Sequence, residues 1–364
     1  MHTKNGQGMH MDSANLVAEA ATRILRDVAD PQTVNRAAND AWKAPAWAAL
    51  EEAGLTLAWV PEGLGGAGAE LDDGFAVLRE AGRVAAAVPL AETLLAGWLL
   101  AQAGIASPKG AMTCGPTRDG EKLTLAGNGT LSGALRSVPF ASGAEHLAVL
   151  ARREGGGAAV ALVEASQARI TEGTGIGGDP LNAVSFSGAR PSAVKDAPAG
   201  LDGQALLLMG ATARAMQMAG ALEAVLDLSV AYANERVAFE RAIAKFQAVQ
   251  HNLARLAGEV AVAIAAAGSA ADALAHAGAF DEAVFLEAAA AKIRVGEAAG
   301  EGAAIAHQVL GAIGFTQEHI LHRFTRRLWA WRDDFGNESF WAVKLGNMVA
   351  AKGADGLWPM LAAR

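Results

Sequence analysis

Apolar positions along the chain follow three patterns, one after another. In the first hundred residues they recur at i, i+3 and i+4, as in NLVAEAATRILRDVA, which predicts amphipathic helices. Short apolar runs such as KLTLAG, AAVALVEA and AVSFSG come next, and their bounding Gly, Asn and Ser favour strands. After the linker KDAPAGLDG the helical period returns and continues to the end. We therefore predict a helical domain over 11–106, a β-domain over 107–200 and a helical bundle over 201–364.

Turn signals place the elements inside these blocks. The stretch LAWVPEGLGGAGAELDD is a loop, because Pro61 and its glycines break helices, and Asp72 or Asp73 is a candidate N-cap for the helix that follows. The middle runs suit a small antiparallel sheet or barrel. Short loops in the last block favour antiparallel helix neighbours. We predict helices at 203–236, 244–276, 280–310 and 317–330, with a last one from about 338.

Composition narrows the class of protein. Hydrophobic residues make up 52% of the 364-residue chain and aromatic residues only 5%, so packing depends on close contacts between alanine-rich helices. A net charge of −8 argues against nucleic acid and anionic membranes as partners. The lone Cys114 cannot form an internal disulfide.

The N-terminal sequence and the apolar runs indicate where in the cell the protein is found. The first residues lack the apolar core of a secretory signal, and the alanine-rich runs are too weakly apolar for a membrane span. We predict a cytoplasmic protein without a membrane span. The first ten residues are set aside as upstream sequence, with Met11 as the working start.

Three segments, in order, resemble signatures of one enzyme family. RVAFERAIAKFQAVQ, which begins at Arg236, resembles the R-x-x-F-G-x-x-I-x-x-F-Q-x-x-Q signature of the acyl-CoA dehydrogenase family. ALEEAGLTLAWVPEGLGGAGAEL is similar to the family's LxExGLxxLxVPExxGGxG segment, and HQVLGAIGFTQEHILHRFTRR to its xQxxGGxGFxxExxLxRxxRD segment. Three motifs in series are much more specific than one.

The resemblance implies a fold and an activity. The fold is mainly α: an N-terminal helical domain, a central β-domain and a C-terminal four-helix bundle, with FAD and an acyl-CoA thioester bound between them. A glutamate of the enzyme removes the α-proton of the thioester, the β-hydrogen leaves as hydride to the flavin, and electrons pass to an electron-transferring flavoprotein.

The resemblance also implies FAD contacts. A guanidinium suits the FAD pyrophosphate because its planar fork donates two charge-assisted hydrogen bonds. By motif position Arg236 is that ligand, and Phe239 packs on the adenine. In the family such groups reach across a dimer interface into the neighbouring subunit's flavin site. The remaining implied cofactor-binding residues are Gln247 and Gln308, as amide donors, and Gly311, Ala312 and Gly314, where small residues allow close backbone approach.

Two flavin-binding segments depart from the family pattern. The loop that normally reads xxTExxxGSD is AMTCGPTRDGEKLT here, which keeps Thr113 but has Cys114 in place of the glutamate. The family's WxT segment aligns with Ser137, Val138 and Pro139, so the aromatic ring and the hydroxyl are both absent, and Pro139 has no backbone N–H to donate.

The catalytic base is absent from both of its usual positions. In many members it lies in a YEGT turn, which is replaced here by DDFGNESF, with Phe335 and Gly336 at the tyrosine and glutamate positions. In other members it lies in the first bundle helix, where this chain has Gly210 and Ala211. A base must reach the substrate α-carbon, so we expect no base at these positions.

The nearby acidic and imidazole groups are weak substitutes. Glu338 is the best alternative base in the chain, although a carboxylate at a helix start is common without any catalytic task. We expect Asp333 and Asp334, beside Arg332, to be surface charges. His319 and His322 share a helix face, but further ligands are not identifiable, and we predict no metal. His251 and His307 also lie in predicted helices.

Three functional interpretations follow. Groups that the family sends to a neighbour's flavin are kept, whereas groups that build the chain's own site are lost. We therefore favour a subunit of a heteromeric α2β2 acyl-CoA dehydrogenase, paired with a homologous catalytic subunit, a kind of assembly known in the family for bulky acyl chains such as steroid side chains. The alternatives are a self-sufficient homo-oligomer that uses Glu338, and a structural paralogue without activity.

Overall fold

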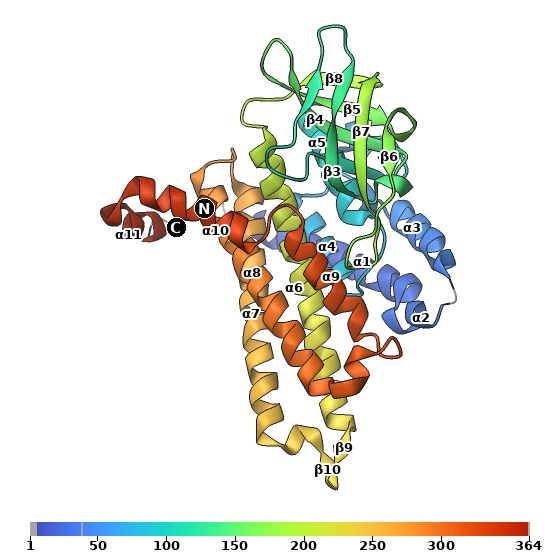
Figure 1. Cartoon of the computed structure of the whole chain (residues 1–364), viewed down its shortest axis with the longest axis vertical. Coiled ribbons are helices and arrows are strands. Elements are labelled where there is room, and N and C mark those ends of the chain that lie inside the picture. The colour runs from blue at the N-terminus through green and yellow to red at the C-terminus, as the bar shows by residue number, and fades with distance from the viewer. Residues whose placement is uncertain (1–5, 38, 363–364) are drawn as a thin grey trace.

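Helices, a sheet and a helical bundle follow one another along the chain (Figure 1). The computed structural model describes residues 6–37 and 39–362, and residues 1–5 of the segment set aside above lie outside this part. The predicted fold class, a helical domain followed by a β-domain and a bundle, is confirmed. The exact domain boundaries stay a prediction.

The described residues of the N-terminal block form helices joined by loops, without a strand. Its fourth helix begins at Leu71 and is capped by Glu70, with Asp73 completing a reciprocal capping box. The predicted cap at Asp72 or Asp73 is therefore wrong by two or three residues, because Asp73 occupies the third helical position of the box. The helices are α1 (Gly6–Ala29), α2 (Pro31–Arg36), α3 (Lys43–Glu52), α4 (Leu71–Arg83) and α5 (Leu90–Gln102), with 3₁₀ turns η1 (Asp40–Trp42), η2 (Leu55–Leu57) and η3 (Glu62–Leu64).

The middle block is one eight-stranded sheet with its own apolar core. Its path runs β6-β7-β3-β2-β4-β5-β8, and β1 adds beside β4. Most pairings are antiparallel, as predicted, but β1 and β2 each pair with β4 in parallel, which the sequence did not indicate. The strands are β1 (Met112–Gly115), β2 (Leu123–Leu125), β3 (Leu131–Pro139), β4 (His146–Arg153), β5 (Ala158–Glu164), β6 (Arg169–Thr171), β7 (Leu181–Ala189) and β8 (Ala193–Asp196), with η4 (Ala141–Gly143) and η5 (Ala165–Gln167) between them.

The C-terminal block is a four-helix bundle followed by two helices that project from it (Figure 1). The bundle helices match the predicted ranges closely, except that the fourth starts four residues later. They are α6 (Gly203–Glu235), α7 (Gln247–His276), α8 (Glu282–Leu310) and α9 (Leu321–Asp333), joined through β9 (Val237–Ala238), β10 (Arg241–Ala242), η6 (Ile243–Lys245) and η7 (Gly311–Phe315) and followed by α10 (Glu338–Lys352) and α11 (Ala354–Ala362).

Helix α6 is the centre of the molecule. It packs against α4, α7, α8 and α9, and most of its first two-thirds is buried. Two glycines allow the close approach to α4: a Cβ on Gly220 would lie 1.9 Å from the Arg79 carbonyl oxygen, and one on Gly82 would lie 2.0 Å from that of Gln217. These glycines thus allow the close helix packing at the interface between the first and last blocks.

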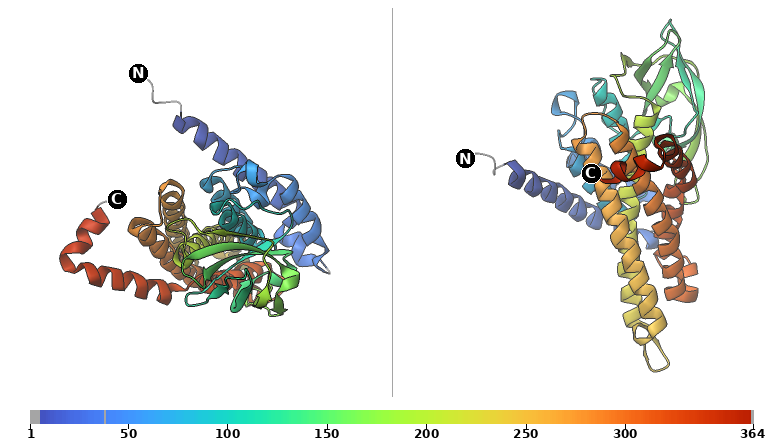
Figure 2. Two further views of the ribbon diagram at one scale, coloured as in Figure 1. Left: turned by 90° about the horizontal axis from the view of Figure 1, so that it is seen from above. Right: turned by 90° about the vertical axis from the view of Figure 1, so that its left-hand side faces the viewer.

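The long helices separate two ends of the molecule. The sheet lies at one end of the bundle and the β9–β10 hairpin at the other, as two perpendicular views agree (Figures 1 and 2). Within the described part, α6 and α7 are long and apolar enough to span a membrane, but the relevant window of α6 is entirely buried, as expected for a core helix.

Candidate functional site

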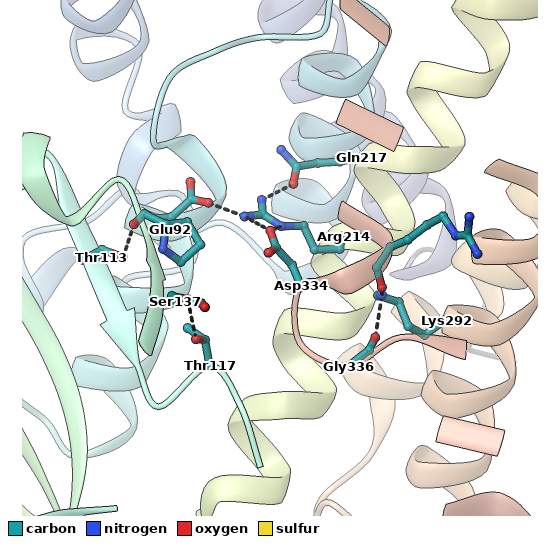
Figure 3. A network of polar contacts seen from close by, with 11 residues as sticks. Glu92, Thr113, Thr117, Ser137, Arg214, Gln217, Lys292, Asp334 and Gly336 are labelled. Carbon is teal, nitrogen blue, oxygen red and sulfur yellow. Dashed lines mark hydrogen bonds and ion pairs between the residues drawn. The ribbon is translucent and has the colours of Figure 1, made fainter. Parts of the chain in front are cut away.

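A buried ion cluster joins the N-terminal block to the bundle near the sheet end of the bundle (Figure 3). Arg214 on α6 donates to Glu92 on α5 at 2.5 Å and to Asp334, just after α9, at 2.9 Å. The side chains of Arg214 and Glu92 are only 3% and 4% exposed. We name Glu92, Arg214 and Asp334 the Arg214 cluster.

Each of the three guanidinium nitrogens of Arg214 donates a hydrogen bond. Its Nη1 donates to Gln217 Oε1 at 2.6 Å, and its carbon lies 5.9 Å from the centre of the Phe335 ring. Burial opposes the charged form, but the carboxylates of Glu92 and Asp334 more than offset it and raise the pKa of Arg214. Arg214 is therefore charged at neutral pH, whereas burial raises the pKa of Glu92 against the attraction of Arg214.

The turn after α9 is held from several sides. Phe335 has a left-handed backbone with φ 53°, and its ring lies over Gly210, where a Cβ would come within 2.1 Å. Trp341 Nε1 donates to the Phe335 carbonyl at 3.0 Å. Lys292 Nζ donates to the carbonyls of Arg332 at 2.6 Å and Gly336 at 2.7 Å. These contacts hold the left-handed backbone of Phe335 in place despite its strain.

Lys292 gives this turn a testable pH dependence. Burial lowers the pKa of Lys292 from 10.5 to about 8, against the attraction of Asp334 and Glu338. Between these two pH values the unfolded chain binds the extra proton, so the contribution of Lys292 to the free energy of unfolding rises with pH. We expect the stability of the parent relative to Lys292→Met to rise from pH 8 to pH 10, measured by urea denaturation. Parallel pH profiles of the two proteins would contradict this assignment.

A cleft of about 510 Å³ lies between loops of the sheet block and the α9–α10 turn. Pro139 and Phe140 line one side, and Trp329, Asp334 and Glu338 line the other. Arg214 also borders it, so the Arg214 cluster forms part of its wall.

The threonine retained from the family's flavin loop is not available to this cleft. Thr113 is fully buried, and its hydroxyl donates to the Pro139 carbonyl at 2.8 Å (Figure 3). Thr117 donates in the same way to the Ser137 carbonyl at 2.9 Å. Two threonine hydroxyls thus bind the strand that replaces the family's WxT segment.

Cys114 is also confined to the interior. Burial raises the pKa of the Cys114 thiol to about 12, so it stays protonated and unreactive at neutral pH.

The acidic residues of the turn have different roles. Asp333 is exposed, as predicted. The prediction that Asp334 is a surface charge is wrong, because α9 ends just before it and its carboxylate pairs with Arg214. Glu338 is the first residue of α10 and accepts from Arg332 Nε at 2.7 Å. A Cβ on Gly296 would lie 2.0 Å from the Glu338 carboxylate, which shows that the carboxylate rests against α8. Glu338 borders the cleft as a paired carboxylate.

The residues of the FAD signature lie at the other end of the bundle. Arg236 is the C-cap of α6, is exposed, and forms no ion pair in the described part of the chain. Phe239 is 88% exposed at the hairpin tip, with its ring 6.1 Å from that of Phe246. Gln247 starts α7, and Gln308 is near the end of α8. Of the three small residues, Gly311 (φ 65°) and Ala312 are exposed and Gly314 is buried.

The cleft and the FAD-signature residues lie at opposite ends of the bundle, too far apart for one chain to contact the same cofactor ring with both. Arg214 borders the cleft, and Arg236 ends the same helix, about 33 Å further along at 1.5 Å per residue. The signature residues point outward at the end remote from the chain's own cleft. This arrangement suits contacts with a neighbouring subunit.

The histidines do not assemble a metal site in the described residues. His307 is buried, with its Nε2 3.2 Å from Thr325 Oγ1, and stacks on Phe315. His319 contacts Tyr232 edge-on, and His322 Nδ1 lies 2.8 Å from the His319 carbonyl oxygen.

Comparisons with known proteins agree with this architecture. The acyl-CoA dehydrogenase N-terminal domain matches residues 11–110, and the acyl-CoA dehydrogenase C-terminal domain matches residues 203–332. The chain is 31% identical over 339 residues to the acyl-CoA dehydrogenase FadE34 of Mycobacterium tuberculosis (strain ATCC 25618 / H37Rv), covering 91% of this chain but only 45% of FadE34. It is 29% identical over 325 residues to the acyl-CoA dehydrogenase IpdE2 of the same organism, covering 87% and 91% of the two chains.

Solved structures share the whole fold. A chain of the ChsE4-ChsE5 complex from Mycobacterium tuberculosis superposes with a TM-score of 0.81 at 24% identity, covering 96% of this chain and 98% of that one. The Tcur3481-Tcur3483 steroid ACAD G363A variant gives 0.82 at 25% identity, covering 95% and 99%.

The three-block fold, with its cleft between sheet and bundle, is that of a family of FAD-dependent oxidoreductases. The chain belongs to the acyl-CoA dehydrogenase family, whose cofactor is FAD. The residues at the far end fit a flavin contact, because Arg236, Phe239 and Gln308 are exposed, and the side chains of Arg236 and Gln308 have no hydrogen-bond or ion-pair partner among the described residues. The chain's own cleft fits a flavin poorly, because Thr113 is turned inward and Pro139 offers no N–H.

Sequence reasoning missed Glu92, Arg214, Gln217 and Lys292. Their signal was nonetheless present: each is a polar or charged residue inside an alanine- and leucine-rich helix, as in PLAETLLAGWLL and LLLMGATARAMQMAG. Charged residues are rarely buried without a partner, so isolated charges in apolar helices predict mutual pairing.

Proposed function

We propose that this chain is one subunit of a heteromeric α2β2 acyl-CoA dehydrogenase. In this assembly it supplies FAD contacts from the far end of its bundle to a homologous subunit. That partner holds the isoalloxazine ring, carries the catalytic glutamate and binds the acyl-CoA. FAD provides the hydride acceptor for α,β-desaturation of the thioester, and an electron-transferring flavoprotein takes the electrons.

The proposal rests on one observation. Residues suited to contact a flavin are exposed at the far end of the bundle, whereas the cleft end lacks the base-bearing turn of the family. The far end presents Arg236, Phe239 and Gln308 to solvent. At the cleft end, Phe335 and Gly336 replace the base-bearing turn, and Arg214 closes the wall with two carboxylates. The similarity to the Tcur3481-Tcur3483 steroid ACAD supports a paired assembly and a bulky, steroid-like acyl chain.

At the cleft end, the buried polar residues of this chain stabilise the fold. The Arg214 cluster ties α5, α6 and the α9–α10 turn together, and Lys292 holds the same turn by its carbonyls. A rigid cleft end keeps the long helices in register, which positions Arg236 and Gln308 for the partner. We propose a cytoplasmic location for the assembly.

Flavin content tests the proposal. We expect the purified chain alone to be colourless and inactive on acyl-CoA substrates. Purified with a homologous subunit that retains the glutamate, it should yield a complex with one FAD for each pair of chains and acyl-CoA-dependent flavin reduction. Stoichiometric FAD with turnover in the isolated chain would instead establish the self-sufficient homo-oligomer. A complex whose flavin content is unaffected by this chain would establish the structural paralogue.

Glu338 provides a second, independent test. We expect Glu338→Gln to leave turnover of the assembled complex within a few-fold of the parent, because Glu338 is paired with Arg332 and a carboxylate at a helix start is favoured without any catalytic task. A general base contributes about 10²–10⁴ in rate, so the measurement is decisive. A loss of about a hundredfold or more, with flavin and folding intact, would identify Glu338 as the base.

A further inference from the structure

A small basic cavity lies where the three blocks of the fold meet. It has a volume of about 200 Å³ and shares Gly177 and Asp179 with the cleft. The N-terminal block contributes η1 and the start of α3, the middle block contributes the β6–β7 loop, and the bundle contributes α9. Its charged or imidazole-bearing residues are Asp40, Lys43, Asp179, His322, Arg323, Arg326 and Arg327.

The cavity has more positive than negative charge. Its two carboxylates are each already paired, Asp40 with Lys43 at 2.7 Å and Asp179 with Arg327 at 2.7 Å. Arg323 and Arg326 form no ion pair within the described residues. Because the whole chain carries a net charge of −8, this surplus is local and does not follow from a basic composition.

Two guanidinium nitrogens in this cluster lack partners although they are buried. Among the described residues, the Nε atoms of Arg323 and Arg327 have no hydrogen-bond partner. Arg327 is only 5% exposed, and its other two nitrogens donate to Asp179 and to the Arg323 carbonyl. Burial and the nearby Arg327 lower the pKa of Arg323 to about 10. An unpaired buried donor or charge is costly, so a bound anion that accepts from these nitrogens would be stabilised.

We propose that this cavity binds one phosphate group, either as free phosphate or as a phosphate monoester. Guanidinium forks match a tetrahedral oxyanion by bidentate, charge-assisted hydrogen bonds. A cavity of about 200 Å³ has room for a phosphate group. Bound there, the phosphate joins α9 to the N-terminal and middle blocks. The site is independent of the flavin contacts proposed above.

Thermal unfolding of the flavin-free, full-length chain tests this site. A ligand that binds only the folded state raises Tm, so inorganic phosphate should raise Tm by about 2–4 °C over sodium chloride at equal ionic strength. Arg323→Met removes the unpaired charge, so it should raise Tm without phosphate and reduce the phosphate response to below about 1 °C. Arg326→Met, at an exposed position, should also weaken the response without unfolding the chain.

Arg255→Met is the matched control, because Arg255 is an exposed arginine that pairs with Glu301 outside the cavity. It should respond to phosphate like the parent. Adenosine monophosphate distinguishes the two sources: a rise equal to or greater than that with phosphate indicates a phosphate carried on a larger ligand, and a smaller rise indicates free phosphate. An Arg323→Met response equal to the parent's, or no rise in the parent beyond that with chloride, would overturn the proposal.

Discussion

Replacement of Arg214 with methionine is expected to lower the free energy of unfolding by about 3–5 kcal/mol, the usual cost of breaking a buried ion pair from one side. The reason is the pair of carboxylates that remains. Glu92 would lose its hydrogen bond at 2.5 Å and stay in the interior without its ion-pair partner. Asp334 would lose its hydrogen bond at 2.9 Å and keep only the attraction of Lys292. Urea denaturation at pH 7, followed by circular dichroism, measures the loss.

Two further variants show whether burial is the cause. Arg79 pairs with Glu223 between α4 and α6, but its side chain is 34% exposed, so Arg79→Met should cost only about 0–1 kcal/mol. Combining Arg214→Met with Glu92→Gln and Asp334→Asn removes the unpaired charges and should recover part of the loss. Equal costs for Arg214→Met and Arg79→Met would show that the Arg214 cluster is not a special feature of the core.

The second large effect is expected at the opposite end of the bundle. In the assembled complex, Arg236→Ala should weaken FAD binding by about 1.5–3 kcal/mol, the range for a hydrogen bond to a charged group. That corresponds to a tenfold or greater rise in the FAD dissociation constant. Arg236→Lys should restore only part of the affinity, because an ammonium is a point charge and cannot reproduce the fork. Fluorescence titration of the flavin-depleted complex measures the affinity.

Arg241→Ala is the control for this experiment. Arg241 lies on the same hairpin, is also exposed, and stacks over Phe246 with 4.2 Å between the guanidinium carbon and the ring centre. We expect it to leave FAD affinity near that of the parent. Full flavin occupancy of Arg236→Ala at limiting FAD would show that Arg236 is an ordinary surface residue.

The sequence determined the elements because their signals are local. Apolar periodicity located the bundle helices to within a few residues at most ends, and short apolar runs bounded by turn residues located strands such as β2, β5 and β7. Three motifs in series identified the family, and the loss of the YEGT turn and the WxT segment was visible without coordinates. Parallel pairing of β1 and β2 with β4 was not visible, since a strand's own pattern does not specify its neighbour.

Only the tertiary structure decided which charges meet. Arg214 lies 122 residues from Glu92 and 120 from Asp334, and no local pattern links residues so far apart. For the same reason Asp334 was expected on the surface, and the sequence did not indicate that the retained Thr113 donates its hydroxyl to the Pro139 carbonyl. The sequence by itself thus determined the family and the eroded catalytic motifs. The fold decided that buried ion pairs form part of the cleft wall while Arg236 has no ion pair among the described residues at the far end. Burial and long-range electrostatics depend on distances that only packing sets.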